Sequence, residues 1–333
     1  MKRKLFAAAA LGLLSAGSLV SGIIACAANN DALQKDASLE NGFIRLTVEQ
    51  DSGQVEYLKF RLDTTGGQEN NTGDDNKRIT YDKFCTGYTT ININGNNFVY
   101  GEGEDASEPA YDVDGKCHIS SQRFGDVVVE QKLTFAEGFT KGYEDMLDIS
   151  YKVLEASPNT SVGVRVLLDP MLDTDDMASL SVSDVKLASE AVFRDTIPAE
   201  WKAETKSNDK ISAYGKLSGG DVQPSEVVFA DWGNIYDTLW DYEPDINTQI
   251  TDAAAAVVWN PVSEAEGKVF STSYGIKNAA NTGKKSDTKL KSAPKTGVNF
   301  PVSAAVLFGI SVVSAGGAVI IKRKDKDEEN AES

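Results

Sequence analysis

Alternation of apolar and polar residues runs through the middle of this 333-residue chain and restricts its fold more than any other feature. Apolar side chains occupy every second position from Leu147 to Val153 and again from Val162 to Leu168, with Ser157-Pro158-Asn159 between the two runs. A period of two is typical of a strand that buries one face of a sheet. The two runs therefore predict a hairpin of adjacent antiparallel strands.

Turn residues at short intervals predict further hairpins. Asn94-Gly95 lies between two apolar runs and is typical of a type I′ turn. Asp114-Gly115 and Asp51-Ser52-Gly53 occupy equivalent places, the second before an expected strand at 55–58. Further strands are expected at 127–135, 253–259 and 269–276. No long segment between the two ends has helical periodicity, so we predict an all-β fold, a large antiparallel β-sandwich of Greek-key or supersandwich type.

The N-terminal end has the pattern of a secretory signal peptide. Three basic residues at positions 2–4 precede an apolar stretch over 5–25, and Ala25-Cys26-Ala27 offers the small residues of a cleavage site. A retained anchor helix is one alternative. A lipoprotein is another, because Ile23-Ile24-Ala25-Cys26 is similar to a lipobox.

The C-terminal end has three parts: Ala293-Pro294-Lys295-Thr296-Gly297, an uncharged segment over 298–321, and the basic cluster Lys322-Arg323-Lys324. Twenty-four helical residues span about 36 Å, which is enough to cross a bilayer. The basic cluster predicts a cytoplasmic C-terminus. A cleaved signal peptide and this span together predict an exported chain.

These three parts resemble the sorting signal of Gram-positive cell-wall proteins of the LPxTG type, which sortases recognise. In that family the motif is cut between Thr and Gly, and the Thr carbonyl is transferred to a peptidoglycan amine. The resemblance implies cleavage after Thr296, with sortase and peptidoglycan as partners. Ala293 departs from the usual Leu at the first position. The alternative is a plain single-span anchor, and a GPI anchor fits worse because a polar tail follows the span.

The expected organisation is a signal peptide at 1–27, a leader at 28–40, the extracellular domain at 41–276, a flexible stalk at 277–292 and the sorting signal at 293–333. The whole chain has a net charge of −17. The signal peptide carries three positive charges and the part after Thr296 a net charge of −1, so the remainder carries −19. This charge excludes nucleic acid as a partner. Membrane contact is expected only through the termini, before processing.

Part of the domain also resembles an extracellular β domain of secreted bacterial proteins. The matching segments are Val164 to Asp169, Phe229 to Gly233, Tyr236-Asp237, Trp240-Asp241-Tyr242, Trp259-Asn260-Pro261 and Ser273-Tyr274-Gly275. No activity is attached to that domain, so the resemblance implies only an exported β fold.

Four carboxylates crowd one loop after a strand: Asp169, Asp173, Asp175 and Asp176. Oxygen ligands at this spacing predict a calcium site, although the EF-hand pattern is absent. The alternative is a solvated acidic loop. A zinc site of several imidazoles is excluded, because the chain has a single histidine, His118.

Three aromatic residues, Trp232, Tyr236 and Trp240, fall at helical spacing and would share a face if the segment is helical. Such a face could stack on the sugar rings of a ligand, and the alternative is packing against the sandwich. Cys85 and Cys117 are the cysteines left after signal cleavage, and a disulfide between them is possible in an exported protein.

No catalytic residue is predicted. No Gly-x-Ser-x-Gly motif or Gly-rich phosphate loop is present, and Cys117 and His118 would point to opposite faces of a strand. We therefore expect a display protein of the Gram-positive cell wall that binds or adheres to a protein or glycan ligand. The alternatives are a wall-anchored carbohydrate hydrolase with paired carboxylates and a structural envelope protein.

Overall fold

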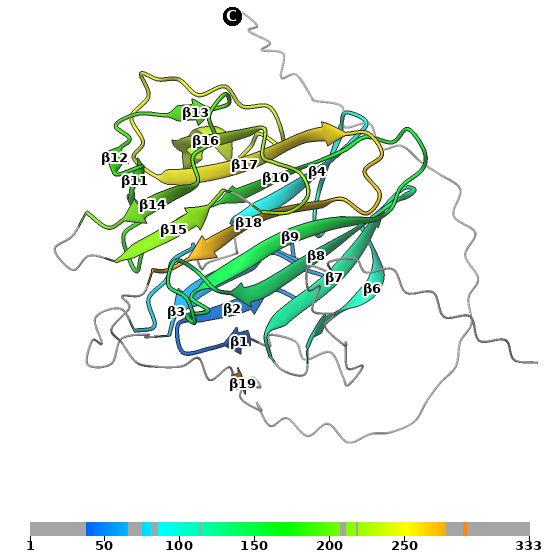
Figure 1. The fold of residues 1–333 in the computed structure, drawn as a ribbon, viewed down its shortest axis with the longest axis horizontal. Helices are drawn as coiled ribbons and strands as arrows, with labels where there is room; N and C mark the ends of the chain where they lie inside the picture. The colour runs from blue at the N-terminus through cyan, green and yellow to red at the C-terminus, as the bar shows by residue number, and fades with distance from the viewer. Residues whose placement is uncertain are drawn as a thin grey trace, which may run out of the picture. The chain divides into compact units, whose positions relative to one another are not determined.

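The computed structural model describes residues 38–65, 75–81, 86–112, 115–206, 211–217, 219–277 and 289–291 (Figure 1). The chain divides into two compact units, 1–294 and 295–333, and all of the described residues belong to the first. In this part the only helix is α1 (Trp232–Ile235). No helix there is both long enough and apolar enough to cross a bilayer. The predicted signal peptide, sorting motif and span over 298–321 lie outside the described residues.

The strands form three sheets, and all of their pairings are antiparallel. The six-stranded sheet has the order β13 (Ala191–Phe193), β16 (Glu226–Asp231), β17 (Ala253–Val262), β10 (Val162–Leu168), β4 (Tyr88–Ile93), β5 (Asn96–Val99). The nine-stranded sheet has the order β12 (Val185–Lys186), β11 (Ser179–Val182), β14 (Glu200–Glu204), β15 (Ser212–Lys216), β18 (Val269–Gly275), β9 (Met146–Glu155), β8 (Val127–Ala136), β7 (Cys117–Phe124), β6 (Glu104–Tyr111). The third has the order β19 (Lys289–Lys291), β1 (Ser38–Glu40), β2 (Ile44–Val48), β3 (Phe60–Thr64).

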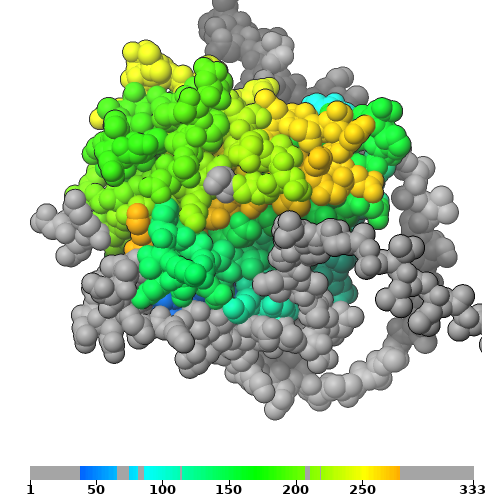
Figure 2. Space-filling model, in the orientation of Figure 1, coloured from blue at the N-terminus to red at the C-terminus, as the bar shows by residue number. Residues whose placement is uncertain are grey.

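The two larger sheets pack face to face around one apolar core, so the predicted antiparallel sandwich is confirmed. Trp201 of β14 contacts Phe229 of β16, with ring centroids 5.7 Å apart. The Tyr151 hydroxyl of β9 donates to Thr89 Oγ1 of β4 at 2.7 Å, which links the sheets by a buried polar contact. Side chains cover the strands of the larger sheets, as the space-filling view of one face of the molecule illustrates (Figure 2).

The hairpin predicted from residues 147–168 is wrong. β9 pairs with β8 and β18 in the nine-stranded sheet, whereas β10 pairs with β4 and β17 in the six-stranded sheet. Ser157-Pro158-Asn159 does turn the chain, with φ of 69° at Asn159, but the link carries it from one sheet to the other. The reason is burial: β9 alternates, whereas all seven residues of β10 are buried and need cover on both faces.

Two of the other turn predictions agree with the structure, and the strand expected at 55–58 does not. Asn94-Gly95 joins β4 to β5 with φ of 50° and 84°, as a type I′ turn requires. The strands on either side of Asp114-Gly115, β6 and β7, also pair. The strand expected at 55–58 is a turn instead, and β3 begins only at Phe60.

A long connection over residues 232–252 covers the outer face of β10 and β17. Ile235 packs there with Leu167, Val228 and Ala254 in a second apolar cluster. The buried Glu190 carboxylate holds this connection in place by accepting four hydrogen bonds. The donors are the backbone N–H groups of Asp231 and Asp245, the Asn234 amide and the Tyr242 hydroxyl. The connection leads into β17 and so places Asp252.

Candidate functional site

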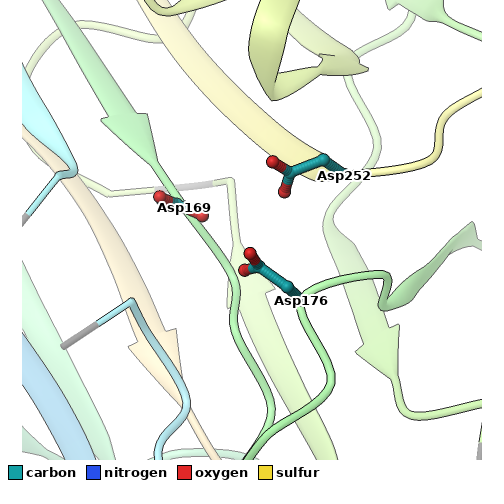
Figure 3. Close-up of side chains that lie close together, drawn as sticks. All are labelled: Asp169, Asp176 and Asp252. Atoms are coloured by element: carbon teal, nitrogen blue, oxygen red, sulfur yellow. The ribbon is translucent and has the colours of Figure 1, made fainter. Parts of the chain in front are cut away.

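Three aspartates from separate segments meet at one end of the six-stranded sheet (Figure 3). Asp169 directly follows β10, and Asp252 directly precedes β17. These strands are antiparallel, with Leu168 opposite Ala255, so the end of one lies beside the start of the other. Asp176 comes from the loop after β10. One carboxylate oxygen from each residue lies within 4.8 Å of the other two.

The loop reaches the cluster because it folds back on itself. Leu172 and Asp175 donate backbone hydrogen bonds to each other's carbonyl groups, and the turn between them has Asp173 at a φ of 57°. Short polar side chains tolerate this left-handed conformation better than branched ones do. Asp176 therefore follows a tight turn that directs it back toward the end of β10.

Asp169 is buried, Asp176 and Asp252 are partly buried, and all three carboxylates have an oxygen without a hydrogen-bond partner among the described residues. Asp169 is only 3% exposed, and its Oδ2 accepts a hydrogen bond from Thr86 Oγ1. The Oδ1 atoms of Asp169, Asp176 and Asp252 are all buried, and none has a hydrogen-bond partner within the described part of the chain. A buried polar atom without a hydrogen bond lowers the stability of the fold, and such atoms are rare in native proteins. Three of them close together are therefore unusual. The cluster therefore needs a proton or a cation.

The pKa values of all three aspartates are raised, as expected for carboxylates that lack a compensating charge. The pKa of Asp169 is raised to about 7, mainly by burial and also by the negative charges of Asp252 and Asp176, against the lowering effect of the Thr86 hydrogen bond. Burial also raises the pKa of Asp252 to about 7, with Asp176 and Asp231 adding to the shift. The pKa of Asp176 rises through burial and the neighbouring Asp175. Ionisation is disfavoured because, among the described residues, no positive side chain contributes to the pKa shift of any of the three.

The oxygen separations fit a calcium ion. Calcium binds oxygen at about 2.3–2.6 Å, so two oxygens that share one ion lie at most about 5 Å apart. The oxygens of the cluster lie within 4.8 Å of one another, which is compatible with that geometry. Three carboxylates supply only part of a calcium shell, and carbonyl groups or water would complete it.

The cluster includes two of the four aspartates predicted from the loop. Asp173 instead forms an ion pair with Lys77, at 2.7 Å between Oδ2 and Nζ. Asp175 accepts backbone hydrogen bonds from Met177 at 3.0 Å and from Lys206 at 2.8 Å, so it holds the loop. Sequence reasoning missed Asp252, because only the pairing of β10 with β17 brings it to the others.

The three aromatic residues do not form one platform. The helix ends at Ile235, so helical spacing does not continue to Trp240. Trp232 stacks on Tyr236, with ring centroids 5.8 Å apart. The Trp240 ring lies against Gly163 of β10, where a Cβ atom would be 2.8 Å from its Cη2.

His118 and Cys117 are both buried in β7. Burial lowers the pKa of His118 to about 3, and the Tyr111 ring lies 4.8 Å from the imidazole. Cys117 takes part in a disulfide. Cys85 and Cys26 lie outside the described residues, so the pairing with Cys85 stays a prediction.

No protein-family model matches this chain, and no curated protein does. Among solved structures, it is similar to the heparan sulfate lyase HepC from Pedobacter heparinus, with a TM-score of 0.39 and 8% identity over 78% of this chain and 41% of that one. It is also similar to the 4-alpha-glucanotransferase from Thermococcus litoralis, with a TM-score of 0.34 and 9% identity over 72% of this chain and 36% of that one. The chain spans less than half of either enzyme, and values this low assign it no activity.

Proposed function

We propose that this chain is an exported display protein of the cell surface whose β-sandwich domain binds calcium and presents a binding surface to a protein or glycan ligand. The observation that carries the calcium proposal is the meeting of Asp169, Asp176 and Asp252. Each of them has a buried Oδ1 without a hydrogen-bond partner among the described residues, and one carboxylate oxygen of each lies within 4.8 Å of the other two.

One observation favours a bound cation over carbohydrate hydrolysis at these aspartates. The three Oδ1 atoms are closed to solvent, so a sugar ring could not reach them, whereas an ion needs only oxygen ligands.

The location at the cell surface rests on the sequence. A signal-peptide pattern precedes the domain, and the Pro-Lys-Thr-Gly motif, apolar segment and basic tail follow it. Extracellular modules commonly bind calcium with a Kd of about 0.1–1 mM, so a partly buried site of three carboxylates suits that environment.

Thermal unfolding of the full-length chain in detergent tests the calcium site. With a Kd of about 0.1 mM, 1 mM calcium would stabilise the fold by about 1.4 kcal/mol and raise Tm by about 3–6 °C relative to EDTA. We expect Asp176→Asn to reduce this shift. Asp126→Asn makes the same charge change in the exposed β7–β8 turn and should keep it. An equal shift in all three proteins would contradict the proposal.

Cell fractionation tests the anchor separately. In cells with a matching sortase, the native chain should resist detergent extraction and appear in the wall fraction. Thr296→Ala removes the carbonyl donor residue of the motif and should leave the chain extractable. A native chain that is always extracted by detergent would show that the C-terminal segment is only a membrane anchor.

A further inference from the structure

Lysines gather at one end of the nine-stranded sheet, although the chain has 33 basic and 50 acidic residues. Three ammonium groups lie close to the aromatic rings of Phe139 and Tyr214. Lys277 Nζ is 4.5 Å from the centroid of Phe139 and 5.5 Å from that of Tyr214. Lys216 Nζ is 5.2 Å from Phe139, and Lys202 Nζ is 6.0 Å from Tyr214.

Strand register explains why these side chains share one face. Lys202 of β14 is opposite Tyr214 of β15, which in turn is opposite Gly275 of β18, two residues before Lys277. Lys216 is two residues beyond Tyr214 and so points to the same side. The buried residues of β14 and β15 alternate with these, which places the lysines on the outer face of the sheet.

A polar groove of about 370 Å³ continues this face over β11, β12 and β14. Two more lysines, Lys186 and Lys206, line it together with Lys202. Hydroxyl groups of Ser179, Ser181 and Thr205 also line it. We use the name lysine groove for this groove together with Phe139, Tyr214, Lys216 and Lys277.

Acidic side chains lie beside three of these lysines. Glu204 pairs with Lys202, Asp184 lines the groove, and Glu200 is opposite Lys216 in the sheet. Lys186 and Lys277 have no carboxylate within ion-pair distance in the part of the chain that the structure describes. Asp175 lies beside Lys206 and Asp148 interacts electrostatically with Lys216, so five acids lie near the five lysines, and Lys186 and Lys277 are the two that remain for an anionic ligand.

Cation–π contacts hold the ammonium groups in place before any ligand binds, and lysine acts as a point charge toward anionic groups. The groove hydroxyls can exchange hydrogen bonds with sugar hydroxyls, and its lining suits a hydrated chain more than a lipid. We propose that the lysine groove binds an acidic polysaccharide. This inference rests on the proposed binding function and names its ligand class.

The test uses the full-length chain in non-ionic detergent with calcium present, and measures its affinity for short dextran sulfate chains. Neutral dextran of equal length controls for sugar contacts without charge. Lys186→Gln combined with Lys277→Gln removes two groove charges. Lys152→Gln combined with Lys268→Gln is the matched control, because these residues lie at the other end of β9 and β18, about 20 Å away along the strand.

We expect dextran sulfate to bind in a salt-dependent way and neutral dextran not to bind. The groove variant should bind about tenfold more weakly or worse, and the control variant should bind like the native chain. The proposal is overturned if dextran sulfate does not bind or if both variants lose affinity equally. It is also overturned if polyglutamate binds more tightly than dextran sulfate or if sedimentation shows that the groove joins two copies of the chain. Calcium binding is measured without polymer, so failure of the calcium site gives a separate result.

Discussion

Acidification should destabilise the fold through His118. Burial lowers its pKa to about 3 in the folded chain, compared with about 6.5 in an unfolded one. Between these values the unfolded chain binds a proton that the folded chain does not. The stability that neutral His118 contributes is therefore complete above the unfolded pKa and is lost as the pH falls toward the folded pKa. From about pH 7 to pH 5 the loss is roughly 2 kcal/mol, at 1.36 kcal/mol per pH unit below about 6.5.

Urea unfolding of the native chain and of His118→Gln at both pH values isolates this effect, because the other titrating groups cancel in the comparison. Glutamine is close to histidine in size and can keep the contact that Nε2 makes with the Gln50 amide at 3.3 Å. The native chain should lose about 2 kcal/mol more than the variant between the two pH values. A stability difference that does not change with pH would show that His118 is not held neutral, and would refute the reasoning.

Three further results are expected. Glu190→Ala should lower the free energy of unfolding by about 2–4 kcal/mol in urea titrations, because four donors lose their acceptor, and Glu190→Gln should cost less. Gly215→Ala should cost about 1–3 kcal/mol and reduce the near-UV signal of Trp201, since the new Cβ would lie 2.0 Å from its Nε1. In EDTA, the raised pKa values of Asp169 and Asp252 mean that the folded chain keeps protons that the unfolded chain has lost, so the Tm of the native chain should fall relative to that of Asp252→Asn as the pH rises from about 4 to about 7. Saturating calcium should remove that fall.

The sequence predicts the fold class well, because alternation reports which residues face the core. The alternation from Leu147 to Val153 corresponds to β9, and Asn94-Gly95 forms the expected turn. The pairing of neighbouring strands is less predictable. Alternation over residues 162–168 predicts burial of one face only. All seven residues are buried, Arg165 included, because the connection over 232–252 covers the other face, which local alternation does not indicate.

The sequence likewise predicts only part of the candidate site, because local spacing does not report contacts between distant segments. A short acidic loop drew attention to Asp169 and Asp176, but their neighbours Asp173 and Asp175 serve an ion pair and the loop backbone. Asp252 is 76 residues further along the chain than Asp176, and only the register of β10 with β17 places it in the cluster. Local spacing carries no information about a contact of this kind.

Isothermal titration of calcium into the full-length chain tests the central claim most directly. We predict binding near one ion per chain with a Kd of about 0.1–1 mM, as in extracellular calcium modules. Asp252→Asn should abolish or greatly weaken it, whereas Asp126→Asn should not. The absence of heat in the native chain, or equal binding by the native chain and Asp252→Asn, would contradict a calcium site at these three aspartates.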